Sequence, residues 1–136
     1  MRLKERIKEH EGHRGKVYKC TEGFDTIGYG FAIKDLVLSK EVSDKILDEI
    51  LDSLTKRVEA TFDWVDSVPE AVKEVLIEMS YQMGVSGVSK FKLALKAMKS
   101  HDWEESANQM LDSRWAVQTP NRAKELSNIV RSQGSN

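Results

Sequence analysis

The sequence of 136 residues is poor in cysteine and proline and has no long apolar run. Its one cysteine, Cys20, excludes the internal disulfide framework that many small secreted domains use. No stretch approaches the ~20 apolar residues that a membrane-spanning helix needs. The first residues also lack the apolar core of a secretory signal. We therefore expect a protein that is made in a reducing cytoplasm, without stable insertion into a membrane.

The sequence also lacks an excess of either charge, because it has 21 basic and 22 acidic residues and a net charge of −1. This balance gives no reason to expect a nucleic acid as partner. The histidines, His10, His13 and His101, lack metal-ligand spacing to other donors, so we expect no metal site and no cofactor. Hydrophobic residues make up 40% and charged residues 32%, which is typical of a globular domain. A monomer is the expected state.

The first forty residues change from a helical to a strand-like pattern. Leu3 and Ile7 share a stripe within residues 2–10, which predicts a short amphipathic helix. Residues 16–31 are rich in β-branched and aromatic side chains and contain several glycines. They predict a β-hairpin or small meander with a turn at 21–23. Since strand side chains alternate, Thr26 is expected to point away from its neighbours Asp25 and Ile27.

The rest of the chain predicts helices. Ser39 is expected to cap a long helix whose apolar face extends to Val58. Ser67 and Glu70 have the spacing of a capping box, followed by an almost wholly apolar helix that should be central and buried. Gly84 and Gly87 are expected to bracket a turn. Shorter helices are expected near 90–99 and 103–112, and a last one with Thr119 as cap and Pro120 in its first position.

These elements predict an α+β protein with a single domain over residues 1–136. A small β lobe is expected at about 12–38 and a connecting helix at about 39–59. The helical lobe would combine residues 1–11 with residues 60–131. A cleft between the lobes is the expected ligand site.

One glutamate stands where an acid could serve catalysis. Hydrolysis of a glycosidic bond needs an acid that protonates the leaving oxygen and a second group on the other face of the sugar. Glu11 at a helix end facing the hairpin could supply the first, and hairpin residues the second. By spacing alone a solvated surface role for Glu11 is the commoner outcome.

The segment 11–30, EGHRGKVYKCTEGFDTIGYG, resembles the catalytic segment of the phage-type lysozymes. That family has Glu, eight residues, Asp or Cys, five residues, then Thr in a T-I-G-x-G motif, which Glu11, Cys20 and Thr26 match. The stretch Tyr81-Gln82-Met83-Gly84 resembles the end of the family's central helix. Residues 113–123 resemble its S-R-W…Q-T-P-N-R-A signature. These matches keep the family's order over most of the chain.

The resemblance implies a role for each matching residue. Glu11 is the expected general acid, and Thr26 would position or help to activate water beneath the sugar. Arg122 would pair with Glu11 from the last helical segment. Gln82 and Trp115 match a buried cluster behind the cleft, next to Tyr81.

Two features depart from the pattern of the best-known members. Cys20 stands where they have Asp, and a thiol of ordinary pKa is mostly uncharged near neutral pH. Three roles are open for it: orienting water, attacking as a nucleophile, or taking no part. The stretch after Gly30 is also short, which predicts a reduced small lobe. Phe31 and Ala32 occupy positions where longer relatives place other side chains near the substrate.

The leading interpretation is an endolysin that hydrolyses the β-1,4 bond between N-acetylmuramic acid and N-acetylglucosamine in peptidoglycan, with inversion expected. It would accumulate in the host cytoplasm and reach the wall after another protein opens the membrane. An alternative is a peptidoglycan-binding lysozyme-like protein with weak catalysis. A third is a lysozyme-like domain of a phage tail, which we expect to come with further domains. Non-hydrolytic cleavage to an anhydro product is a further alternative.

Overall fold

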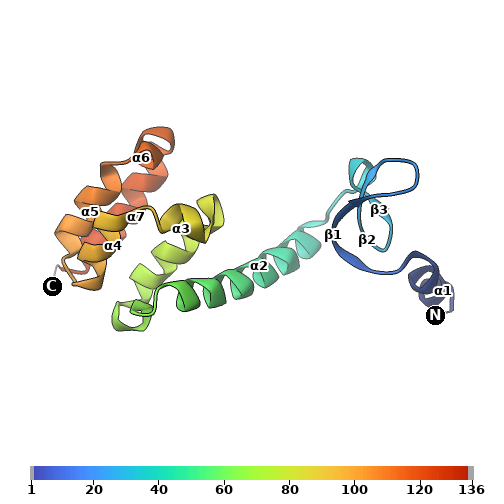
Figure 1. Ribbon diagram of the computed structural model, residues 1–136, viewed down its shortest axis with the longest axis horizontal. Helices are drawn as coiled ribbons and strands as arrows, with labels where there is room; N and C mark the ends of the chain where they lie inside the picture. The colour runs from blue at the N-terminus through green and yellow to red at the C-terminus, as the bar shows by residue number, and fades with distance from the viewer. Residues whose placement is uncertain (1, 135–136) are drawn as a thin grey trace. The chain divides into compact units, whose positions relative to one another are not determined.

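The computed structural model describes residues 2–134 and divides into two units, Met1–Asp44 and Lys45–Asn136. Figure 1 shows the small sheet in the blue, N-terminal part of the chain and helices in the remainder. The predicted α+β class is confirmed. Each unit is described below by itself.

The first unit contains one helix and a three-stranded antiparallel sheet of order β1-β2-β3. Its elements are α1 (Arg2–Glu11), β1 (Arg14–Lys19), β2 (Asp25–Gly28), β3 (Phe31–Ala32) and the short 3-10 helix η1 (Ile33–Asp35). Helix α1 ends at Glu11, and the chain turns at the next residue, Gly12, which has φ +67°. The Gly12 amide donates to the Lys8 carbonyl at 2.9 Å. The predicted helix and meander are therefore confirmed.

The register of the sheet decides which side chains share a face. Thr26 in the middle strand lies opposite Tyr18 of β1 and Ala32 of β3, so these three residues form a row across the sheet. Asp25 lies opposite Lys19, and the Lys19 Nζ–Asp25 Oδ1 distance is 2.8 Å. Because successive strand residues alternate, Thr26 and Asp25 face opposite sides, as predicted.

A tight turn joins the first two strands at the position predicted for it. The amide of Cys20 donates to the Phe24 carbonyl and the amide of Gly23 donates to the Cys20 carbonyl, both at 2.9 Å. This hydrogen bonding fixes Cys20 at the start of the turn.

Helix α2 (Lys40–Thr61) begins directly after Ser39. The Ser39 Oγ accepts a hydrogen bond from the Val42 amide at 3.2 Å, so the predicted cap is confirmed. Leu54 and Val58 are the buried residues of this helix.

The predicted capping box at Ser67 and Glu70 is wrong. Ser67 ends a 3-10 turn, η2 (Val65–Ser67), and its hydroxyl donates to the Trp64 carbonyl at 2.7 Å. Helix α3 (Glu70–Val88) starts instead after Pro69, with no side-chain cap. Helix α3 begins at Glu70 with Pro69 in the cap position, so Ser67 lies two residues too early to accept from its first amides.

Helix α3 is the central element of the second unit. Its buried side chains include Val72, Val75, Leu76 and Met79, as its apolar sequence predicts. The helix is interrupted at Gly84, which has φ +80° and ψ 156°. A left-handed φ of this kind is a conformation that glycine adopts at little cost. The chain therefore kinks at Gly84, but residues 85–88 are again helical and include Gly87, so the predicted turn between the two glycines is wrong.

Four further helices complete the second unit: α4 (Lys92–Lys99), α5 (Trp103–Leu111), α6 (Arg114–Gln118) and α7 (Pro120–Ser132). Residue contacts join α5 to both α4 and α7, and Figure 1 shows the three helices grouped at the C-terminal end of the chain. Helix α6 was not predicted; Ser113 caps it by accepting from the Ala116 amide at 3.2 Å.

Thr119 occupies the cap position of α7, as predicted, but its side chain makes no cap hydrogen bond; the hydroxyl donates to the Trp115 carbonyl at 3.0 Å. Pro120 takes the first helical position, as predicted. Among residues 2–134, no helix combines the length and the apolarity needed to cross a bilayer.

The hydrophobic core belongs to the helical unit. Within the described residues, every buried hydrophobic side chain lies between Leu54 and Val130, whereas Thr26 is the only buried residue before Leu54. A small unit without a buried apolar core gains little from hydrophobic burial, so its geometry depends on backbone hydrogen bonds and turns.

We expect Leu76→Ala to destabilise the protein by about 2–5 kcal/mol, because Leu76 is fully buried in the core and its loss leaves a cavity. Leu93→Ala is the matched control, since the Leu93 side chain is 63% exposed. Urea denaturation followed by circular dichroism measures both. Equal unfolding free energies for the two variants would contradict the placement of the core.

Candidate active site

The three residues Glu11, Cys20 and Thr26 line one hollow of about 320 Å³ in the first unit, here called the sheet hollow. The other residues that line it are Tyr18, Glu22, Phe24, Gly30, Ala32, Lys34 and Asp35. The fold therefore brings together, within a single unit, three side chains that are separated by up to fifteen positions in the sequence.

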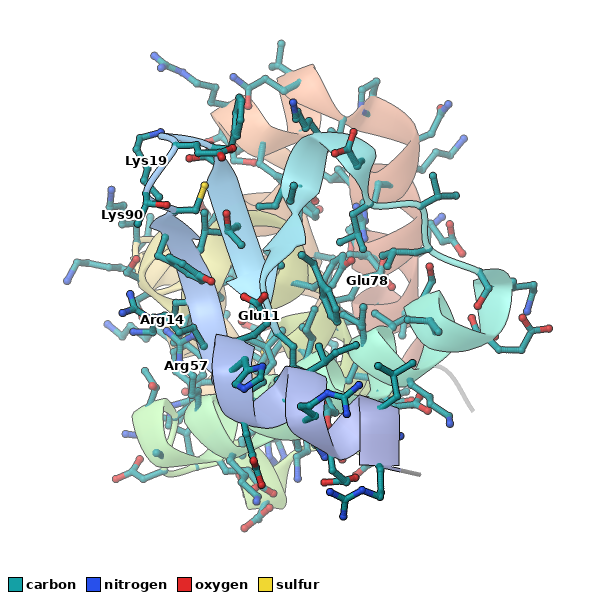
Figure 2. The ribbon with its side chains drawn as sticks, turned by 90° about the vertical axis from the view of Figure 1, so that its right-hand side faces the viewer. Glu11, Arg14, Lys19, Arg57, Glu78 and Lys90 are labelled. Carbon is teal, nitrogen blue, oxygen red and sulfur yellow. The ribbon has the colours of Figure 1, made fainter. Side chains whose placement is uncertain are left out.

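Glu11 is placed by the meeting of a helix end and a sheet turn. It is the last residue of α1, and its carboxylate is directed toward the strands, as Figure 2 shows. A β-carbon built on Gly30 would lie only 2.6 Å from Glu11 Oε2. Gly30 also has φ +78°, which disfavours other residues. The second glycine of the T-I-G-Y-G motif thus leaves the space that the Glu11 carboxylate occupies.

Thr26 forms the floor of the sheet hollow and is 3% exposed. Its hydroxyl donates to the Phe24 carbonyl at 2.8 Å. A hydroxyl has one proton and two lone pairs, so the proton is engaged and the lone pairs remain able to accept. Thr26 can therefore receive a hydrogen bond from a water molecule in the hollow.

Cys20 is half-buried beside Thr26. The backbone amides of Phe24 and Glu22 and the Thr26 hydroxyl lower the pKa of the Cys20 thiol, against smaller opposing effects of desolvation and the Glu22 carboxylate. Because the Thr26 proton already goes to Phe24, we attribute the lower pKa chiefly to the two amides. Hydrogen bonds that favour the charged form of a thiol make it a better nucleophile and a better acceptor.

Phe31 and Ala32 end up on different sides of the sheet. Ala32 lines the sheet hollow, whereas Phe31 pairs with Ile27 on the other face and places its ring over Gly28. Phe31 is therefore not among the residues that line the hollow.

Sequence reasoning missed five residues that line the hollow: Tyr18, Glu22, Phe24, Lys34 and Asp35. Tyr18 could have been found, since it lies two positions before Cys20 and strand side chains repeat with a period of two. Lys34 and Asp35 come from the short η1 turn, which has no periodic signal. The Lys34 ammonium lies 3.9 Å from the centre of the Phe24 ring, a cation–π contact at the edge of the hollow.

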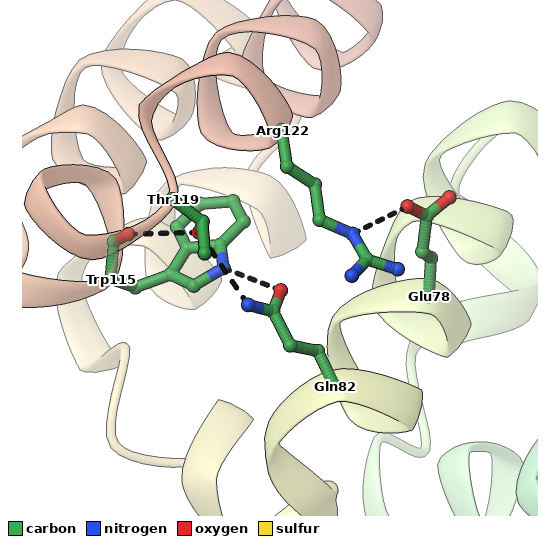
Figure 3. A network of polar contacts seen from close by, with 5 residues as sticks. All are labelled: Glu78, Gln82, Trp115, Thr119 and Arg122. Atoms are coloured by element: carbon green, nitrogen blue, oxygen red, sulfur yellow. Dashed lines mark hydrogen bonds and ion pairs between the residues drawn. The ribbon is translucent and has the colours of Figure 1, made fainter.

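In the helical unit, Arg122 pairs with Glu78, with 2.8 Å between Arg122 Nε and Glu78 Oε2 (Figure 3). Both residues line a second hollow together with Tyr81, which is 50% exposed. The expected pair of Glu11 and Arg122 joins residues of different units and stays a prediction.

Gln82 of α3 forms hydrogen bonds to α6 and to Thr119, the residue that follows α6 (Figure 3). Its Oε1 accepts from Trp115 Nε1 at 2.8 Å, and its Nε2 approaches Thr119 Oγ1 at 3.5 Å. Trp115 is 7% exposed, and the Gln82 side chain supplies the hydrogen-bond acceptor that its buried indole N–H needs. In the described part of the chain, no three His, Cys, Asp or Glu side chains are grouped as metal ligands.

The sheet hollow thus brings together a carboxylate, a thiol and a hydroxyl, and glycoside hydrolysis is a reaction that such groups could serve. The family model of phage lysozyme matches residues 8–133. Probable T4-type lysozyme 1 of Dictyostelium discoideum is 27% identical, over 94% of this chain and 92% of that protein. The pre-baseplate central spike protein Gp5 of Enterobacteria phage T4 is 33% identical, over 96% of this chain and 28% of that protein.

The chain belongs to the phage lysozyme family and is a lysozyme-type glycoside hydrolase. The alignment with the first Dictyostelium protein covers 157 positions, more than the 136 residues of this chain. The relative therefore has residues within the aligned region that this chain lacks.

We expect the rate of Cys20 alkylation by iodoacetamide to reach half its maximum below about pH 8.5, the ordinary pKa of a free thiol. Only the thiolate reacts, and a lowered pKa lets it form at lower pH. Cys20 is the one cysteine, so the reaction reports on it alone. In urea the midpoint should return to the ordinary value. A folded midpoint at or above the unfolded one would contradict the stabilisation by the turn amides.

Proposed function

We propose that the protein hydrolyses the β-1,4 bond between N-acetylmuramic acid and N-acetylglucosamine in bacterial peptidoglycan. The observation that supports this most is the sheet hollow, which Glu11, Cys20 and Thr26 line together. These are the positions at which the family's Glu, Asp or Cys, and Thr stand. The reaction would contribute to lysis of the host cell.

In this proposal Glu11 gives its proton to the bridging oxygen between the two sugars. The bond from C1 to that oxygen breaks, and its electron pair goes to the leaving oxygen. A water molecule bonds through its oxygen to C1 and releases a proton to solvent, from which Glu11 is reprotonated. Thr26 accepts a hydrogen bond from this water, because its own proton is donated to the Phe24 carbonyl. The Cys20 sulfur provides a second acceptor beside it.

A second candidate role for this protein is wall hydrolysis as part of a phage particle. Gp5, to which this chain is similar over 28% of the length of that protein, is described as a central spike protein. A domain of this family thus occurs inside a longer protein. In that setting the same chemistry would open the wall locally.

We expect Glu11→Gln to lower the rate of wall hydrolysis by at least about 100-fold, the usual scale for loss of a general acid. Glutamine keeps the shape of the side chain and removes its proton. Clearing of a suspension of peptidoglycan measures the rate, and circular dichroism verifies the fold. Glu9→Gln is the matched control on the same helix, since Glu9 is exposed and does not line the sheet hollow.

A Glu11→Gln variant that clears walls at the wild-type rate would refute the assignment of the acid. A wild-type protein that binds walls without clearing them would support the alternative of a weakly catalytic binding protein.

We expect the fresh product of the wild-type enzyme to have inverted anomeric configuration, because water attacks directly. Cys20→Ser should then retain part of the activity, and Cys20→Asp should retain or improve it, since Asp places a negative charge where positive charge develops on the sugar. Proton NMR of the first product formed reads the configuration. Retained configuration together with an inactive Cys20→Ser variant would instead establish Cys20 as a nucleophile.

A further inference from the structure

The sheet hollow contains carboxylates besides Glu11. Glu22 and Asp35 line it, whereas Asp25 faces the other side of the sheet and pairs with Lys19 at 2.8 Å. Glu22 lies two positions after Cys20 in the turn between β1 and β2. Within the described residues, Glu22 forms no ion pair that would neutralise its charge.

The charge of Glu22 reaches the position of Cys20. Its carboxylate opposes deprotonation of the Cys20 thiol, and no other acidic side chain has a comparable effect on that thiol. The two side chains are therefore within Coulombic range of each other, and both line the sheet hollow.

A glycosidase needs negative charge at this place. Cleavage of the bond leaves the sugar with positive character at C1 and its ring oxygen, and fixed charges in a partly dry site stabilise such a transition state. The Cys20 thiol supplies that charge only in its ionised form. A carboxylate elsewhere on the wall of the hollow supplies it too, with a strength that falls with its distance and with its exposure to solvent.

We propose that Glu22 contributes to catalysis through its carboxylate, which supplies negative charge opposite the sugar while the Cys20 thiol is protonated. This inference rests on the proposed hydrolysis of peptidoglycan. Glu22 neither gives nor takes a proton in this role. It acts through its charge alone, so its amide analogue removes the effect and leaves the shape of the side chain.

The test is a double-mutant cycle on peptidoglycan at low ionic strength. Glu22→Gln should lower kcat about tenfold with little change in KM, since the charge acts on the transition state. In the Cys20→Asp background the same change should alter kcat less than about twofold, because the introduced carboxylate then provides a nearer charge. Asp25→Asn is the matched control, a carboxylate of the same hairpin on the opposite face, and should change kcat less than about twofold.

A second measurement reports the position of Glu22 without any activity. Alkylation of Cys20 in Glu22→Gln should have its midpoint at a lower pH than in the wild type, because a carboxylate that opposes the thiolate is gone. Asp25→Asn should leave the midpoint unchanged. Equal midpoints for Glu22→Gln and the wild type would overturn the inference.

The kinetic outcomes separate this inference from the proposed function. If Glu22→Gln keeps the wild-type kcat, or loses as much in the Cys20→Asp background as alone, the role of Glu22 is wrong while the dependence on Glu11 still stands. If the wild-type protein does not cleave the glycan, or cleaves it equally without the Glu11 proton, the proposed function itself fails.

Discussion

The close approach of Glu11 to Gly30 is the contact on which the candidate site depends. A β-carbon at position 30 would lie 2.6 Å from the Glu11 carboxylate, and the backbone there has φ +78°. Only glycine satisfies both conditions without strain. Because the helix end can approach the sheet turn this closely, the acid faces the row of side chains that contains Thr26.

The site and the core lie in different units and depend on different forces. The helical unit buries its apolar side chains around α3, with the Trp115–Gln82 hydrogen bond as a polar link inside it. The first unit positions its site with backbone hydrogen bonds of the turn at Cys20 and with one buried threonine. The same turn amides that close the hairpin also lower the pKa of the Cys20 thiol, so local structure and reactivity share one cause.

Elements with local signals could be predicted from the sequence. Ser39 caps α2 because the helix begins at the next residue and leaves its first amides free. Ser67 has an equally good pattern but fails, since a 3-10 turn that no periodicity indicates moves the start of α3 to Glu70. The opposite orientation of Thr26 and Asp25 could also be predicted, because alternation along a strand is a property of the backbone.

By itself, the sequence determined the class of the fold, the order of its main elements and, through the motif from Glu11 to Gly30, the family to which the chain belongs. The tertiary structure decided which groups share space with those residues. Glu22, Lys34 and Asp35 line the sheet hollow, and Arg122 of α7 pairs with Glu78 of α3, which is far from it in the sequence. Local propensity acts over a few residues, whereas such pairs are set by the register of the sheet and the packing of helices.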